Sequence, residues 1–323
     1  MCRIILLLLM VLPAYAGKPL EVPFIAQQSG YCGPAALAML ANFYGQPVSQ
    51  AAIANAIYLP DIHGTLTADL ADYAKHFNLW TRQYRGTTTD IRQKLAAGVP
   101  VIVLGKFGDK LHFFVVLGFD EFAVTVLVHS DQRASLVMPQ EQFWRVWDRA
   151  DRWTLLVCPP GKVTWKLTGD ESNDLGVFLE QTGNLPAAAG NYRCATELVP
   201  TNSYFQMNLG NALLKQKLFV EAIVAFRQAI QLEPGNADAR NNLAWAYRET
   251  GANLDEAVEL CRQAVKLQPG RRAYYLDTLG CVLRKQDKTN EAVSVFQEAI
   301  GAATAHEPAL QRAIAEHIAS VND

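Results

Sequence analysis

Apolar residues in the first half of the chain change their spacing partway along. Up to residue 97 they recur every three to four positions, which is typical of amphipathic helices. Beyond it they form short runs of Val, Ile, Leu and Phe between tight polar links, which is typical of antiparallel strands. Helices followed by a sheet predict an α+β domain. The expected helices are 34–43, 50–58, 68–77 and 90–97, and the expected strands are 100–104, 112–117, 123–128 and 153–157.

The second half repeats a pattern of small residues every 34 to 36 positions, at Gly176, Gly210, Ala244 and Gly280. Two alanine sets and a set of closing prolines keep nearly the same spacing: Ala188, Ala222, Ala257 and Ala292; Ala195, Ala229, Ala264 and Ala299; and Pro200, Pro234 and Pro269. Small residues let two helices cross closely, and proline ends the second helix. A generic bundle would not keep such a register, so the pattern resembles the tetratricopeptide repeat and implies an all-α solenoid.

The N-terminal segment, residues 1–16, has the features of a secretory signal peptide. Arg3 precedes an apolar run at 4–12, and the small-x-small triplet Ala14-Tyr15-Ala16 follows. As a helix the run rises only about 14 Å, roughly half of a bilayer core, which favours cleavage after Ala16 over anchoring. We therefore expect a periplasmic or secreted protein without an integral membrane span. The remaining chain is expected to divide into an α+β domain at 17–158, a linker at 159–168 and about four repeats with a capping helix at 169–323.

Composition excludes several partner classes. The chain has 323 residues with Lys+Arg 29 against Asp+Glu 31, so it lacks the basic excess with which proteins bind nucleic acid. No phosphate-loop motif predicts ATP binding, and no pattern predicts another cofactor. His63 and His129 have no ligand-like spacing to cysteines or carboxylates, so no metal site is predicted.

Cys32 is the strongest candidate for a reactive group. It immediately precedes the first expected helix, with Pro34 in the first turn, where its missing N–H is not needed. Free N–H groups and the positive end of the helix dipole should favour the thiolate. A nucleophile is the functional interpretation, and a buried or disulfide-bonded cysteine is the alternative.

Two further groups fit a nucleophilic site. The amide of Gln27 could join the Cys32 N–H in binding an oxyanion. His112 is expected at a strand end, where an imidazole can reach a cleft and act as a base. If the following hairpin turns near residues 120–121, either Ser130 or Asp131 lies beside His112 and orients it.

The stretch Gln27-x4-Cys32-Gly33-Pro34, followed by His112 on an apolar strand, resembles papain-like cysteine peptidases. More narrowly it is similar to the double-glycine leader peptidases that process bacteriocins, family thirty-nine of the papain clan, in a free-standing form fused to repeats. The resemblance implies that Cys32 is the nucleophile, His112 the base and Gln27 the oxyanion donor. The family's orienting acid would correspond to Asp131. The substrate implied is a peptide, cleaved after Gly-Gly in the best-known members.

Other functions remain open at this stage. The papain-like domain could be a non-catalytic adaptor that binds peptides, or the same triad could serve an amidase or acyl transferase. The repeats are expected to bind a protein or peptide through polar and aromatic side chains, although the aromatic residues could instead pack between helices. The expected binding residues are Tyr204, Asn211, Trp245, Arg248 and Tyr274.

The other cysteines are expected to be structural. Cys158 is interpreted as a buried, inert thiol and Cys194 as structural. The near-symmetric placement of Cys261 and Cys281 about a turn leaves a disulfide between them open.

Overall fold

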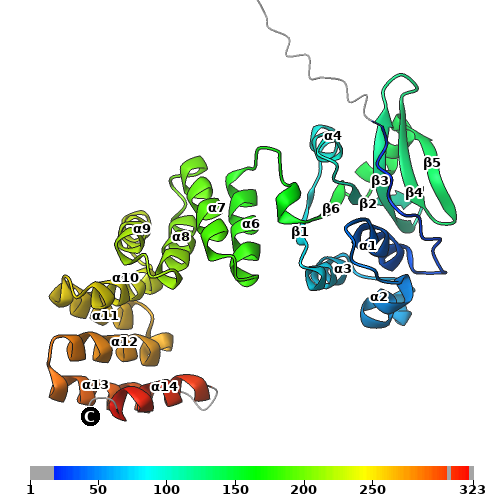
Figure 1. The fold of residues 1–323 in the computed structure, drawn as a ribbon. Coiled ribbons are helices and arrows are strands. Elements are labelled where there is room, and N and C mark those ends of the chain that lie inside the picture. Colours follow the sequence, from blue (N-terminus) through cyan, green and yellow to red (C-terminus); the bar gives the residue numbers. More distant parts are fainter. Residues whose placement is uncertain (1–17, 304–306, 320–323) are drawn as a thin grey trace, which may run out of the picture. The chain divides into compact units, whose positions relative to one another are not determined.

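The computed structural model describes residues 18–303 and 307–319, so the expected signal peptide lies outside the described residues. The chain separates into two compact units at the junction of Lys166 and Leu167 (Figure 1). The first unit combines helices with a sheet, and the second, as far as it is described, is built from helices alone. The predicted fold class, an α+β domain followed by an all-α solenoid, is confirmed.

A small-residue helix forms the centre of the first unit. Helix α1 (Cys32–Phe43) buries every position from Gly33 to Ala41. Its alanines allow close approach on all sides, and such a helix, apolar all round, is stable only inside a core. The other helices up to residue 97 are α2 (Gln50–Ile57), α3 (Thr67–Ala74) and α4 (Thr88–Ala96), of which α4 follows the first strand. The end of the third expected helix is the 3₁₀ turn η2 (Lys75–Phe77).

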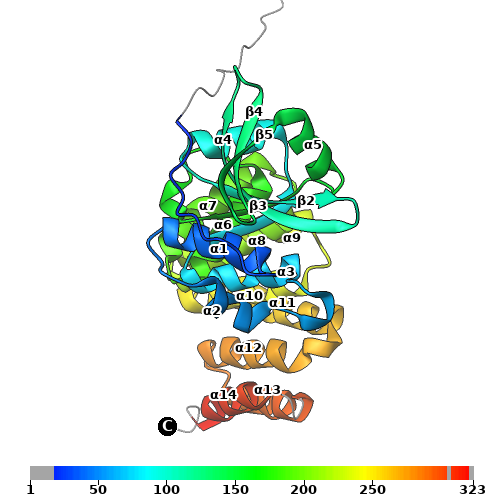
Figure 2. The same cartoon turned by 90° about the vertical axis from the view of Figure 1, so that its right-hand side faces the viewer.

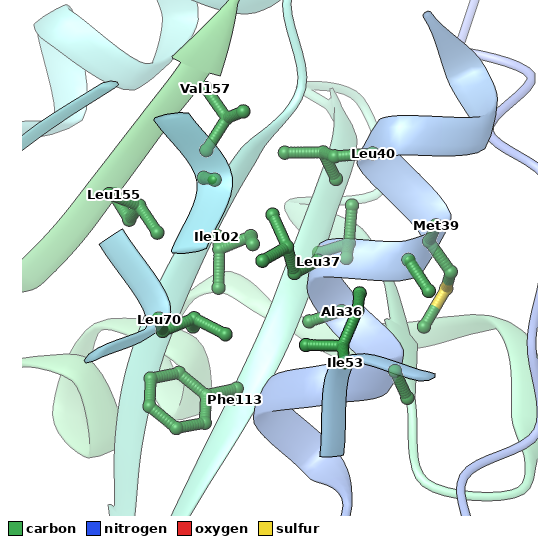
Figure 3. Packing of buried hydrophobic residues seen from close by; sticks show 14 of the residues in the cluster. Ala36, Leu37, Met39, Leu40, Ile53, Leu70, Ile102, Phe113, Leu155 and Val157 are labelled. Carbon is green, nitrogen blue, oxygen red and sulfur yellow. The ribbon is translucent and has the colours of Figure 1, made fainter. Parts of the chain in front are cut away.

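One antiparallel sheet of six strands covers α1, in the order β1-β6-β2-β3-β4-β5. Leu37 and Leu40 of α1 pack with Phe113 and Ile102 of the sheet (Figure 3). Odd-numbered positions of β3 from Phe113 to Leu117 thus face α1. The strands are β1 (Trp80–Arg85), β2 (Val101–Phe107), β3 (Lys110–Asp120), β4 (Thr125–Ser130), β5 (Arg133–Pro139) and β6 (Trp153–Cys158).

Two strands and one α-helix of the described residues are absent from the sequence prediction. Strands β1 and β5 are the two edges of the sheet, and their residues are largely polar or exposed. An edge strand needs no continuous apolar run, because only part of it is covered. Helix α5 (Gln140–Asp148) packs against β2, visible beside the sheet in Figure 2. This short helix follows β5 directly, so no polar loop separates the strand pattern from the helix pattern in the sequence.

The second unit, in its described residues, consists of four helix pairs and a further helix. Each pair is in contact with the next along the chain. The helices are α6 (Gly169–Gln181), α7 (Leu185–Leu198), α8 (Ser203–Lys215), α9 (Phe219–Leu232), α10 (Ala237–Thr250), α11 (Leu254–Leu267), α12 (Arg272–Lys285), α13 (Thr289–Ala302) and α14 (Pro308–Ala319).

The repeated small residues serve close helix crossings. A Cβ placed on Gly210 or Gly280 would lie 2.5 Å from the ring of Phe226 or Phe296, so the ring occupies the space that a side chain would need. In the third pair the aromatic residue is replaced by Cys261, and the facing small residue is Ala244 instead of glycine. The sizes of the two positions therefore complement each other within each repeat.

This packing predicts opposite effects for two glycine-to-alanine changes in helices. Gly280→Ala should lower the free energy of unfolding by about 1–3 kcal/mol, because the buried Phe296 ring must shift. Gly190→Ala, on α7 with no atom within 4 Å of the added methyl, should raise it by up to about 1 kcal/mol. Urea denaturation of both variants measures this. Equal effects would contradict the assigned packing.

The cysteines that the structure describes are all free thiols, so Cys261 and Cys281 are not bridged. Cys194 is exposed rather than packed inside the unit, which corrects its expected structural role. Cys158 is fully buried, and burial raises its pKa to about 12. Among the helices described, none has the length and apolar character needed to cross a membrane.

Candidate active site

An open cleft of about 1480 Å³ in the first unit is lined by all four predicted site residues, Gln27, Cys32, His112 and Asp131. One wall comes from the segment between α2 and α3, including Tyr58 and Thr65. The other comes from the sheet, including Phe113 and Trp153. The cleft exceeds the roughly 300–1,000 Å³ that is usual for a small-molecule pocket, so it has room for an extended peptide.

Cys32 is the first residue of α1, and its side chain is half-buried. The backbone N–H groups of Phe113, Gly33 and Cys32 itself act on the sulfur as hydrogen-bond donors and lower the thiol pKa. Burial has the larger effect, however, and the net pKa of Cys32 is raised. The nearby Asp131 carboxylate adds to the increase. The N–H groups at the helix start act in the expected direction, but desolvation outweighs them, so the balance favours the neutral thiol and not the expected thiolate.

His112 is the third residue of β3, opposite Gly105 of β2. Its ring makes an edge contact with Phe114, with the ring centroids 5.0 Å apart. A Cβ at position 105 would lie 2.5 Å from Phe114, so glycine there gives this aromatic ring its space. Burial lowers the pKa of His112, and the negative charge of Asp131 only partly offsets this. The imidazole is therefore neutral near pH 7 and able to accept a proton.

The hydroxyl of Ser130, at the end of β4, lies 3.0 Å from Nε2 of His112. Asp131 follows in the turn between β4 and β5, with a positive φ of 55°. Its carboxylate raises the pKa of both His112 and Cys32 by its charge. Among the hydrogen bonds of the described residues, His112 is joined to Ser130 and not to Asp131. Of the two alternatives for the orienting group, the structure thus brings Ser130 into direct contact and places Asp131 nearby.

Gln27 is held in the cleft by its backbone. Its N–H donates to the carbonyl of Asp131 over 3.1 Å, and its carbonyl accepts a hydrogen bond from the amide of Gln132. The side chain of Gln50 fixes the neighbouring residues, donating to the Ala26 carbonyl at 2.7 Å and accepting from the Gln28 N–H at 3.0 Å. Because the backbone is held at Gln27 and at the residues on either side of it, the Gln27 side chain extends from a fixed position toward the site where the oxyanion would form.

His129 stabilises the same segment from the sheet. Its Nδ1 accepts a hydrogen bond from the Ser135 N–H at 3.0 Å, so Nε2 carries the proton and donates it to the carbonyl of Val22 at 2.8 Å. Sequence reasoning found no role for His129, Gln50 or Gln132. Their partners on the N-terminal segment that holds Val22 and Gln27 lie between 22 and 107 residues away, so no local motif marks these contacts.

The two candidates for orienting His112 can be separated by mutation. We expect Ser130→Ala to lower kcat on a peptide substrate by about tenfold, because Nε2 of His112 loses its direct partner. Asp131→Asn keeps the backbone contact to Gln27 and should cost less. Steady-state kinetics of the two variants shows which substitution causes the larger loss of kcat. A larger loss in Asp131→Asn would mean that the carboxylate replaces Ser130 when substrate binds.

A cysteine at the start of a buried helix, sharing a cleft with a histidine on an antiparallel sheet, defines a papain-like arrangement. Comparison with protein families agrees: residues 19–152 match the Peptidase_C39 like family, and residues 173–237 and 213–279 match tetratricopeptide repeat families. The chain therefore contains a Peptidase_C39-like domain followed by tetratricopeptide repeats.

Individual similar proteins cover parts of the chain. Stress-induced-phosphoprotein 1 of Caenorhabditis elegans is 34% identical over 101 residues, which are 29% of this chain and 31% of that protein. The human protein O-mannosyl-transferase TMTC3 is 26% identical over 172 residues, 49% of this chain and 18% of that protein. The chain thus spans about a third or less of these relatives.

Among solved structures, MamA 41-end from Desulfovibrio magneticus RS-1 has a TM-score of 0.39 at 22% identity, over 42% of this chain and 75% of the other. The thermophilic TPR protein TTC0263 of Thermus thermophilus has a TM-score of 0.41 at 21% identity, over 47% and 82% of the two chains.

Proposed function

We propose that this protein is a cysteine peptidase that cleaves peptide bonds in an extended substrate bound along the cleft. The observation that carries the proposal is that Cys32, His112 and Gln27 line one cleft, with three backbone N–H groups acting on the sulfur. A nucleophile, a base and an oxyanion donor are the three groups that acyl transfer needs. The match to the Peptidase_C39 like family supports the same class of reaction.

In the proposed mechanism the Cys32 thiol and the His112 imidazole are both neutral at the start. Cys32 holds its proton because burial raises the pKa of the thiol, and His112 is neutral because burial lowers its pKa. As the sulfur attacks the substrate carbonyl carbon, His112 takes the thiol proton. The negative oxygen formed in the tetrahedral intermediate accepts hydrogen bonds from the Gln27 amide and the Cys32 N–H.

The remaining steps return the groups to their starting state. The imidazolium of His112 gives its proton to the leaving amine, and the C–N bond breaks to leave a thioester on Cys32. Water then attacks the thioester carbonyl, with His112 as base, and the released thiol regains its proton. The Asp131 charge stabilises the imidazolium, since it raises the pKa of His112.

The substrate class we propose is a leader-type peptide with small residues before the cleaved bond, processed outside the cytoplasm after removal of the signal peptide at 1–16. The repeats would recruit the substrate or a partner protein. Tyr204 and Tyr274 support this, being 57% and 38% exposed, whereas the amide of Asn211 is already bonded to Asn242 at 2.8 Å. Trp245 stacks on the guanidinium of Arg248, 4.6 Å from the ring centroid.

A second candidate is a peptide-binding adaptor without catalysis. Two observations favour it: the raised pKa of the Cys32 thiol, and a serine instead of a carboxylate in contact with His112. An amidase or acyl transferase would use the peptidase chemistry with a different acceptor for the acyl group.

Digestion of a peptide library by the mature protein, under reducing conditions and read by mass spectrometry, separates these candidates. A peptidase gives new C-terminal and N-terminal products that share one sequence preference, enriched in Gly-Gly if the leader-type proposal holds. An adaptor retains peptides on the immobilised protein without new termini. A library that is neither cut nor retained would refute the peptidase function and the adaptor together.

A further inference from the structure

A second group of cysteine, histidine and carboxylate side chains lies in the repeats, outside the cleft. Asp277 and Cys281 are four residues apart on α12 and therefore share one face of that helix. His317 reaches them from α14, the helix that follows the last repeat. In Figures 1 and 2 α14 lies at the C-terminal end of the repeat unit, where it contacts both α12 and α13.

The three side chains point their donor atoms at one another. Nδ1 of His317 lies 2.7 Å from Oδ1 of Asp277 and 3.6 Å from Sγ of Cys281. All three donor atoms lie within 4.8 Å of one another. In a tetrahedral zinc site with bonds of about 2.0–2.3 Å, neighbouring ligand atoms are roughly 3.3–3.8 Å apart. The cysteine–histidine distance already fits, and the histidine–aspartate pair needs to open by only about half an ångström to admit an ion.

The surroundings favour a borderline transition metal over Mg²⁺ or Ca²⁺. Asp277 and Cys281 are 8% and 1% exposed, so the donors sit at the base of a shielded site. The set contains sulfur, nitrogen and only one carboxylate, whereas Mg²⁺ and Ca²⁺ take oxygen ligands.

We propose that Asp277, Cys281 and His317 bind a divalent transition metal ion, with Zn²⁺ as the expected ion, and thereby fix α14 on α12. The arrangement gives such a site a structural purpose. Within its described residues, α14 buries a single apolar side chain, Ile314, so apolar contacts alone hold it weakly. An ion bound by His317 of α14 and by Asp277 and Cys281 of α12 would join the two helices. Docking of the last helix would then depend on metal binding, since the free energy of ligation contributes directly to folding.

Binding replaces protons by the ion. In the structure His317 and Asp277 share a proton across the 2.7 Å contact between Nδ1 and Oδ1. A metal takes the place of the proton that His317 shares with Asp277 and of the thiol proton of Cys281, and both protons leave to solvent.

Cobalt titration tests the site directly. The full mature chain carrying Cys32→Ala, which removes the cleft thiol, is treated with chelator and titrated with Co²⁺. We expect a sulfur-to-cobalt charge-transfer band and the intense visible bands of tetrahedral Co²⁺, both displaced by Zn²⁺. The bands should be lost when Cys281→Ala or His317→Gln is added, and kept when the exposed Cys194→Ala is added.

A second measurement covers the case in which Cys281→Ala disturbs folding. His317 is only half-buried and lies in the last turn of α14, so His317→Gln should keep the wild-type circular dichroism spectrum. Zn²⁺ should then raise the melting temperature of the Cys32→Ala chain and leave that of the His317→Gln chain unchanged. Absent bands, bands that persist without Cys281, or equal zinc shifts in both chains would overturn the metal site and leave a purely structural contact between His317 and Asp277. None of these results bears on the peptidase activity.

Discussion

Replacing Cys32 by alanine should lower kcat/KM for peptide hydrolysis at least about 1000-fold, the loss that follows removal of a covalent nucleophile. The change removes the sulfur that lines the cleft at the start of α1. Alanine is well tolerated at a helix start that already leads into an alanine-rich segment, so the fold should be retained. Initial rates on a peptide identified from the library, measured alongside circular dichroism, give the result.

The exposed thiol of Cys194 provides the matched control. Cys194→Ala removes an accessible sulfur from the repeats and should leave hydrolysis unchanged. Wild-type turnover by Cys32→Ala would refute the nucleophile assignment and the peptidase proposal with it. Peptide that still binds to Cys32→Ala while remaining uncut would separate lost chemistry from lost recognition.

Replacing His112 by alanine should cost a similar factor, about 1000-fold or more in kcat, and should also change the pH profile. In the wild type, activity requires neutral His112, and protonation removes the base. Because burial lowers the pKa of His112, its neutral form persists below the ordinary histidine value near 6.5. The acid limb of kcat/KM should therefore lie below pH 6.5, with activity lost as the pH falls through the lowered pKa.

His129 serves as the histidine for comparison. It is buried, lies in the same sheet and fixes the Val22 segment, but it does not line the cleft. In His112→Ala the acid limb should disappear from the residual activity, whereas in His129→Gln it should remain even if stability falls. An unchanged acid limb in His112→Ala would show that another group is the base.

Much of the fold could be predicted from short-range patterns. Helix α1 and strands β2, β3 and β6 have continuous apolar sequences, and they form the centre of the first unit. The edge strands β1 and β5 could not be found, because their stability comes from pairing with a neighbour and not from an apolar run.

The pairing register of the hairpin between β3 and β4, which places Ser130 near His112, could not be predicted from the sequence. The expected turn near residues 120–121 lies earlier than the actual one, since β4 begins only at Thr125, and a bulge shifts the register between Val116 and Gly118. Val115 therefore pairs with His129, and Ser130 approaches His112 diagonally across the ladder. Register depends on turn length and bulges, which periodicity does not encode.

By itself the sequence determined the two-part architecture, the repeats and the presence of Gln27, Cys32 and His112 as a candidate set. These rest on contacts between near neighbours in the chain, such as Gly280 with Phe296, or on the residue types that a helix start accepts. Only the tertiary structure decided that the Cys32 thiol is buried and its pKa raised, that Ser130 contacts His112, and that Asp277, Cys281 and His317 meet. Desolvation and side-chain contact depend on segments tens of residues apart packing together, and a linear pattern carries no distance between such segments.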